Sequence, residues 1–199
     1  MTGDNPENGK GGHTMYTEDR NLHYFREISR IPRKSFHEKA VVDYIQRFAG
    51  ERGLRFQRDT LHNLILWAPA TPGREGEAPL MLQAHTDMVC AKEPWSTHDF
   101  LKDPIELVEE NGWLHANGTT LGADDGAGVA NILAILDEPE LSHPPLECVF
   151  TVQEEDGMGG AKGLDCSLLQ SRRMIGLDGI QEGTTIYSAS AVRGCHFEA

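Results

Sequence analysis

One stretch decides the fold of this 199-residue chain: Pro79-Leu-Met-Leu-Gln-Ala-His85-Thr-Asp87-Met-Val89. An apolar run leaves a loop rich in Pro and Gly and ends on His85 and Asp87. Because residues two apart on an extended strand point to the same side, these two side chains are predicted to lie together where a buried strand ends. An imidazole beside a carboxylate suits a divalent metal, as a ligand and its orienting partner. A single His-x-Asp triplet is a weak signal, so the metal prediction depends on the rest of the chain.

Apolar strands and amphipathic helices alternate on both sides of this stretch. Apolar residues at helical spacing predict a helix over 18–30, another between a Ser35–Glu38 capping box and Gly53, and a third over 125–136. Phe36 is expected on the apolar face of the second helix. Asn111-Gly112 predicts a two-residue hairpin turn. Strands are predicted over 54–59, 64–67, 80–84, 105–110, 113–116, 146–152, 174–177 and 184–189. The apolar strands over 146–152 and 174–177 are expected to be buried. The predicted fold is a three-layer α/β sandwich with a mostly parallel central sheet.

Composition narrows the possible partners and compartments. With 18 basic and 31 acidic residues the formal charge is −13, which argues against nucleic acid or an anionic membrane as a partner. The four cysteines form no Cys-x-x-Cys pair, so reduced thiols in a cytoplasm are expected. Residues 1–16 are polar, carry no apolar signal-peptide core, and are predicted to be a disordered tail before one domain over 17–199.

Acidic residues recur where the predicted strands end and where one helix begins. Since carboxyl ends of parallel strands share one edge of a sheet, these side chains can converge although they are far apart in sequence. Any one of them alone is as easily a surface acid, but their repeated placement favours a site for two divalent ions with a bridging carboxylate. Beside His85 and Asp87, the residues concerned are Asp124, Asp125, Glu154, Glu155 and Asp178.

Taken in order, four motifs resemble one known family. They are Gln83-Ala-His85-Thr-Asp87-Met-Val, Gly118-Thr-Thr-Leu-Gly-Ala-Asp124-Asp-Gly, Gln153-Glu154-Glu155 and Leu177-Asp178-Gly179. The chain from about Leu22 onward is similar to the di-zinc aminoacyl-histidine dipeptidases, or cytosolic non-specific dipeptidases, of the co-catalytic zinc exopeptidase clan. The resemblance implies a zinc-exopeptidase-like catalytic domain that hydrolyses dipeptides, Xaa-His and others.

The resemblance also implies the metal ligands. His85 and Asp178 would bind one zinc ion, and Asp124 would bridge it to the second. Glu155 would bind the second zinc, and other divalent metals are alternatives. The peptide bond after Asp124 would be cis.

Two further residues would act beside the ligands. Asp87 would set the tautomer of His85, and Glu154 would be the general base toward the attacking water. In relatives of this type a final histidine completes the second zinc site, whereas His196 lacks the matching context.

Such relatives are also more than twice as long and contain a lid-like domain that contributes to dimerisation. The chain is therefore predicted to be the N-terminal part of the catalytic domain, inactive or nearly so by itself. The full-length form would be a cytoplasmic homodimer. An amino-acid deacylase or carboxypeptidase of the same clan, and a non-catalytic metal-binding or partner-binding remnant, are the alternatives.

Overall fold

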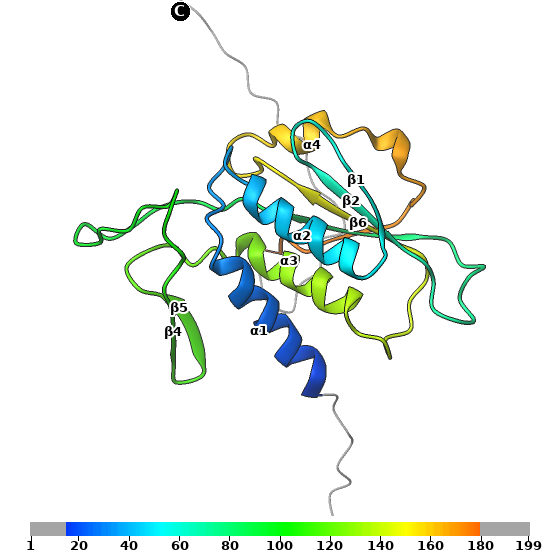
Figure 1. Cartoon of the computed structure of the whole chain (residues 1–199), viewed down its shortest axis with the longest axis horizontal. Coiled ribbons are helices and arrows are strands. Elements are labelled where there is room, and N and C mark those ends of the chain that lie inside the picture. The colour runs from blue at the N-terminus through cyan, green and yellow to red at the C-terminus, as the bar shows by residue number, and fades with distance from the viewer. Residues whose placement is uncertain (1–14, 180–199) are drawn as a thin grey trace, which may run out of the picture.

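A five-stranded sheet forms the centre of the computed structural model, which describes residues 15–179 (Figure 1). Its strand order is β1-β2-β6-β3-β7. β3 is parallel to both β6 and β7, β2 is antiparallel to β6, and β1 is antiparallel to β2, so β2 alone runs against the other four. This confirms the predicted mostly parallel sheet. The strands are β1 (Arg55–Arg58), β2 (Leu64–Ala68), β3 (Leu80–His85), β6 (Leu146–Thr151) and β7 (Met174–Gly176).

Three helices cover one face of this sheet: α1 (Met15–Ser29), α2 (Lys39–Glu51) and α3 (Ala123–Leu136). Figure 1 shows them side by side in front of the strands. Alternate strand residues point toward the helices, because side chains on a strand alternate between its two faces. Burying such a Leu or Phe side chain contributes about 1.5–3 kcal/mol. The core side chains from the three central strands include Leu64, Leu66, Leu82, Ala84, Cys148 and Phe150.

The segment after β6 folds across the opposite face of the sheet. It contains α4 (Gly159–Gly163) and the 3-10 helix η1 (Cys166–Leu168). Glu147 on β6 is 3% exposed, and its carboxylate accepts hydrogen bonds from the backbone N–H groups of Gln170 and Ser171. Since a buried carboxylate needs such donors, these bonds tie the segment to the sheet and complete the third layer.

The hairpin formed by β4 (Leu107–Glu110) and β5 (Trp113–Ala116) projects from the helical side (Figure 1). Asn111 and Gly112 both have positive φ, 53° and 80°, as a type I′ turn requires. The predicted two-residue turn is therefore confirmed.

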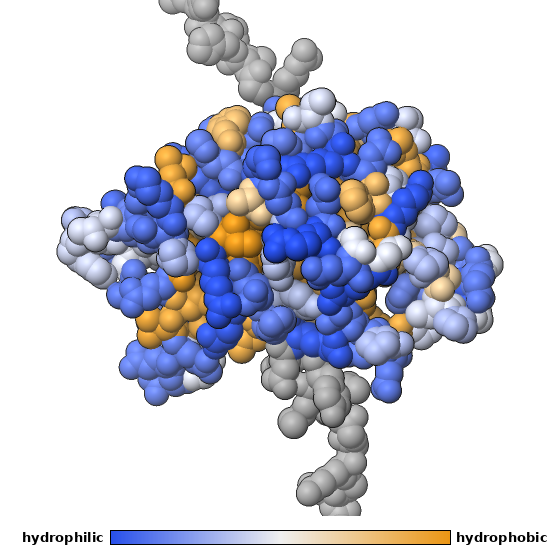
Figure 2. All heavy atoms as spheres, in the orientation of Figure 1, coloured by the Kyte–Doolittle hydropathy of each residue, from blue (hydrophilic) through white to orange (hydrophobic). Residues whose placement is uncertain are grey.

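Polar side chains dominate the face drawn in Figure 2, with apolar patches between them. None of the helices within residues 15–179 is long and apolar enough to cross a membrane.

The start of α2 differs from the prediction. Glu38 is the N-cap residue and makes no side-chain cap hydrogen bond, so the Ser35–Glu38 capping box does not form. Phe36, predicted on the buried helix face, has φ 68° and is 57% exposed. The cause is tertiary, because the Ser35 hydroxyl donates to Asp87 and the Glu38 carboxylate accepts from the backbone N–H of Gln153.

Strand β7 was predicted to be buried, but it forms the edge of the described sheet. Met174 is 61% exposed and Ile175 is 47% exposed. α1 begins at Met15, inside the predicted 1–16 tail. The predicted strand over 184–189 and His196 lie outside the described residues.

Candidate metal centre

Five acidic or imidazole side chains meet at the edge of the sheet where β3, β6 and β7 end. One group consists of His85, Asp124 and Glu155, and a second consists of His85, Glu154 and Asp178. Within each group, one potential ligand atom per residue lies within 4.8 Å of the others. The segments concerned are up to 93 residues apart in sequence, from His85 to Asp178, and parallel strand ends bring them together.

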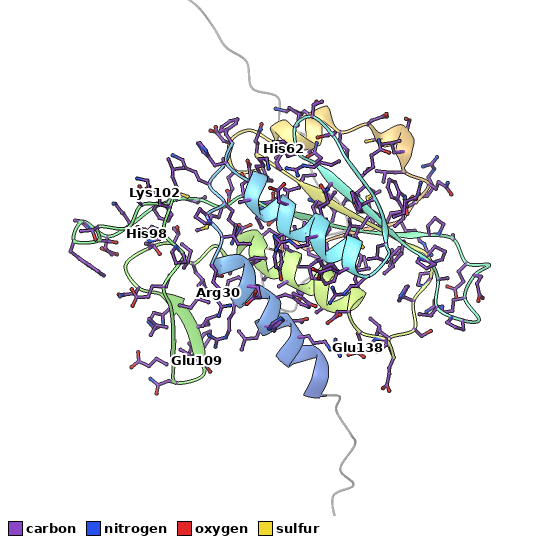
Figure 3. All side chains as sticks on the ribbon, viewed as in Figure 1. Arg30, His62, His98, Lys102, Glu109 and Glu138 are labelled. Carbon is purple, nitrogen blue, oxygen red and sulfur yellow. The ribbon has the colours of Figure 1, made fainter. Side chains whose placement is uncertain are left out.

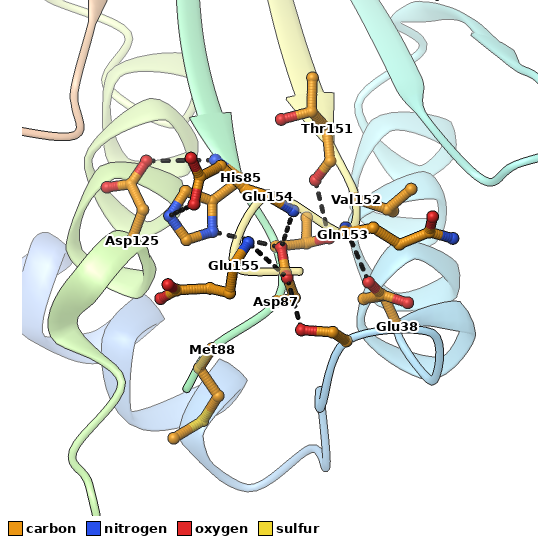
Figure 4. A network of polar contacts seen from close by, with 12 residues as sticks. Glu38, His85, Asp87, Met88, Asp125, Thr151, Val152, Gln153, Glu154 and Glu155 are labelled. Carbon is orange, nitrogen blue, oxygen red and sulfur yellow. Dashed lines mark hydrogen bonds and ion pairs between the residues drawn. The ribbon is translucent and has the colours of Figure 1, made fainter. Parts of the chain in front are cut away.

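His85 is the residue shared by both groups, and it is 1% exposed. Its Nε2 lies 3.0 Å from an oxygen of Asp124 and 3.9 Å from an oxygen of Glu154. Its Nδ1 lies 3.3 Å from Asp87 Oδ1 (Figure 4). Nε2 is therefore the nitrogen that faces the other donors, and Asp87 stands where an orienting carboxylate is expected.

Asp87 is fully buried and connects two strand ends. It accepts hydrogen bonds from the backbone N–H groups of Glu154 at 3.0 Å and Glu155 at 3.2 Å, and from the hydroxyl of Ser35 at 2.8 Å (Figure 4). Burial alone would raise the pKa of Asp87, but His85 and these donors outweigh it and lower the pKa below its usual value. The carboxylate thus remains ionised while it holds the segment after β6.

The start of α3 places the next donors. The Asp124–Asp125 peptide bond is cis, as the family resemblance implied. Asp124 is exposed, whereas Asp125 is 2% exposed and accepts hydrogen bonds from His85 N and Gly128 N, both at 3.1 Å. A Cβ at Gly128 would collide with the Asp125 carboxylate, so a glycine is required there. Asp125 consequently supports the backbone of His85 and does not join the donor groups.

Electrostatics at this edge favour a cation. Burial, reinforced by neighbouring acids, raises the pKa of Glu154 and of Glu155. Burial would lower the pKa of His85, but Asp87 and Asp125 raise it to about 9. Burial also raises the pKa of Asp125 to about 7, against the opposing effect of His85. Four carboxylates and one imidazole are donors that divalent zinc accepts, and a divalent cation would relieve their mutual repulsion.

Other histidines take no part in these groups. His62 and His98 project from separate loops (Figure 3), and neither has two further donors beside it. Within residues 15–179, no other set of three or more His, Cys, Asp or Glu side chains converges.

The geometry and the predicted roles differ in one respect. The prediction assigns Glu154 as a base, yet its carboxylate lies with His85 and Asp178, as a ligand would. Which role it takes, and the metal binding itself, stay predictions.

The sequence pattern does not reveal the residues that hydrogen-bond to the donor segments, namely Arg33, Ser35 and Glu38. The spacing of Ser35 and Glu38 predicts a helix cap, and no sequence pattern indicates the contacts of Arg33. The only sequence clue was polar side chains in a short segment between two helices.

Comparison with known proteins identifies the family. Residues 81–198 match the model of peptidase family M20/M25/M40. The cytosol non-specific dipeptidase of Escherichia coli (strain K12) is 44% identical over 159 residues, which are 80% of this chain and 33% of that protein. The crystal structure of an aminoacylhistidine dipeptidase from Vibrio alginolyticus has a TM-score of 0.82 at 41% identity, covering 85% of this chain and 34% of that one.

A more distant structure agrees on the fold. The YXEP protein of Bacillus subtilis, described as a dinuclear metal binding peptidase from the M20 family, has a TM-score of 0.52 at 16% identity. It covers 80% of this chain and 42% of that one. This chain spans about a third of the length of its two dipeptidase relatives. The matched residues, the fold and the sequence identity together show that the chain belongs to peptidase family M20/M25/M40.

Proposed function

We propose that this chain carries the metal-binding part of the active site of a zinc-dependent dipeptidase. The observation that carries the proposal is the convergence of His85 with four carboxylates from three other segments at one sheet edge. A chain with a charge of −13 has many surface acids, but four carboxylates around one buried imidazole repel one another, and a shared cation would offset that repulsion. The chain over 17–199 would form the N-terminal part of the catalytic domain.

Each donor would have a separate role. His85 and Asp178 would bind one zinc ion, Glu155 would bind the second, and Asp124 would bridge them. Asp87 would keep the His85 ring oriented with Nε2 toward the metal, through its contact with Nδ1.

The bound zinc ions would supply Lewis-acid polarisation of the scissile carbonyl and a lowered water pKa. Glu154 would take the proton from the attacking water at its carboxylate and return it to the leaving amine. Burial and the neighbouring acids raise the pKa of Glu154, which is the direction that favours holding the proton before it passes to the leaving amine. The backbone N–H of Glu154 is held by Asp87, so the base keeps its place relative to His85.

Dipeptides are the proposed substrates, since two similar proteins are named a non-specific dipeptidase and an aminoacylhistidine dipeptidase. The name of the E. coli protein also motivates a cytosolic location, and we propose a homodimer for the full-length form. A deacylase is the second candidate, because an acetylornithine deacetylase of Proteus mirabilis is 33% identical over 87 residues.

Metal titration of the 199-residue chain tests the proposed site. Zinc should bind the wild type, and His85→Ala should weaken binding by at least about tenfold because it removes the ligand common to both groups. His62→Ala is the matched control, since His62 lies in a turn outside the donor groups. Equal zinc affinity of the wild type and His85→Ala would contradict the proposed site.

Substrate assays test the reaction class. The chain should hydrolyse dipeptides weakly or not at all, because His85 is the only imidazole in the donor groups of residues 15–179. On a panel of dipeptides and N-acetyl amino acids, the hydrolysis that remains should be confined to substrates with a free amine, which separates a dipeptidase from a deacylase. Robust hydrolysis of the acetylated compounds alone would favour the deacylase.

A further inference from the structure

The segment of residues 33–38, between α1 and α2, provides none of the predicted metal donors, yet it contacts three of the four segments that do. We call residues 33–38 the clamp segment. Three of its side chains are buried although they are polar: Arg33 is 2% exposed, Ser35 9% and Glu38 3%. Buried polar groups are stable only when bonded, so the partners of these side chains reveal their task.

Arg33 joins the end of β3 to the start of α3. Its Nη1 donates to the carbonyl oxygens of Thr86 at 3.2 Å and Asp87 at 3.0 Å, directly after the predicted ligand His85. Its Nη2 donates to the carbonyl oxygen of Gly122, two residues before Asp124. A guanidinium is planar and holds its donors in a fixed fork, so it sets the distance between these two backbones.

Ser35 and Glu38 add the third segment. The Ser35 hydroxyl donates to Asp87 Oδ2 at 2.8 Å, and Asp87 in turn binds the backbone after β6. Glu38 Oε1 accepts from Gln153 N at 2.9 Å, immediately before Glu154 (Figure 4). The clamp segment thus holds the ends of β3 and β6 and the start of α3, in each case within two residues of a predicted donor.

The positive charge of Arg33 also suits a role in holding the acidic donor segments together. Burial lowers the pKa of Arg33 to about 10, while Asp87, Asp125 and Asp124 favour its charged form. Arg33 is therefore a buried cation at neutral pH behind an acidic edge. A cation there offsets part of the repulsion among the acids before any metal binds.

We propose that Arg33 is a positioning residue of the metal centre, and that Ser35 and Glu38 complete the clamp by fixing the segment after β6. The link to metal rests on the proposed function, whereas the clamping of the three backbones does not. Arg33 touches no donor side chain, so it acts through the backbone of the residues that it holds.

Hydrogen exchange of the metal-free chain tests the clamp itself. Arg33→Met and Ser35→Ala should each speed amide exchange in residues 85–88 and 153–155 by at least about tenfold, and Arg33→Met also in 122–126. Arg58→Met is the matched control, because Arg58 is a largely buried arginine bonded to Asp43 on another side of the fold. Its exchange in these three segments should equal that of the wild type.

Unchanged protection in a folded Arg33→Met chain would overturn the proposal. If Arg33→Met does not fold, Ser35→Ala decides, since it removes one hydroxyl and leaves the guanidinium in place. Wild-type exchange in 153–155 of Ser35→Ala would then count against the clamp.

Cobalt(II) titration tests the link to the metal centre. Arg33→Met should weaken Co²⁺ binding by about 10–100-fold and alter its visible absorption spectrum, as loss of an outer partner does. Arg33→Lys keeps the charge without the fork, so it should recover only part of the affinity. If Arg33→Lys recovers the full Co²⁺ affinity and the wild-type spectrum, the charge of Arg33 is sufficient and its role as a positioning residue is refuted. If the wild type binds no Co²⁺, the proposed function fails, and the exchange experiment still decides the clamp.

Discussion

The replacement Asp87→Asn changes one oxygen of a fully buried carboxylate to an NH2 group and leaves its shape unchanged. Oδ1 accepts from the backbone N–H of Glu154, and Oδ2 accepts from the N–H of Glu155 and the hydroxyl of Ser35. Either orientation of the amide therefore points its NH2 at a backbone N–H that cannot rotate away. The hydroxyl can turn to accept a bond, but the backbone cannot.

The expected loss of stability follows from this conflict. An unsatisfied buried N–H costs about 1–3 kcal/mol, and exchanging charge-assisted bonds for neutral ones adds about 1 kcal/mol. The sum, about 2–4 kcal/mol, is a large part of the roughly 5–15 kcal/mol that holds a domain folded.

Urea denaturation of the metal-free chain at pH 7 measures this loss. Asp43→Asn is the control, because the Asp43 side chain is 40% exposed where it pairs with Lys39 and Arg58, and ion pairs near the surface are worth only about 0–1 kcal/mol. The two variants should have equal m-values and different midpoints. A loss below about 0.5 kcal/mol for Asp87→Asn would refute the bonding scheme at this edge.

Three further predictions concern separate parts of the fold. Burial would raise the pKa of Asp137, but the neighbouring arginines and a tyrosine outweigh burial and lower the pKa. The ionised Asp137 therefore adds its full contribution to folding stability above about pH 4, the ordinary pKa of a carboxyl, and this contribution is lost as the pH falls further. Denaturation between pH 3 and 7 should accordingly show the stability gap between wild type and Asp137→Asn shrinking as the pH falls. In calorimetric zinc titrations Glu155→Ala should weaken binding by at least about tenfold and Glu154→Ala by less than about threefold; the reverse order would make Glu154 the ligand. Gly126→Ala puts a methyl 2.6 Å from the guanidinium of the clamp segment and should lower the melting temperature, whereas Gly50→Ala, in open space on α2, should raise it.

Several features of the fold were predictable because their causes are local. The apolar runs of β3 and its neighbour β6 require a sheet that is covered on both faces. Helical spacing in α3 requires an apolar face, and Asn111-Gly112 requires a tight turn. The acids at the strand ends were visible for the same reason, since each stands directly after an apolar run.

Burial of β7 and the start of α2 could not be predicted from local pattern. β7 is apolar, yet it has only one neighbouring strand within the described sheet. Ser35 and Glu38 match a capping box by spacing, but the helix begins after them. A sequence pattern records which bonds a side chain is able to make, and the tertiary structure determines which of them it makes.

The sequence by itself determined the fold class, the strand ends and the chemical types of the donors. The tertiary structure decided how those donors are grouped and which of the two aspartates at α3 is buried. It also decided which side chains hold the donor segments in place. Ser35 reaches Asp87 across 52 residues, and Glu38 reaches Gln153 across 115. Contacts at such separations depend on how the strands and helices pack, whereas periodicity and turn signals depend only on neighbours along the chain. The residues that meet at this edge of the sheet could therefore be predicted from the sequence, but the contacts that residues 33–38 make with them could not.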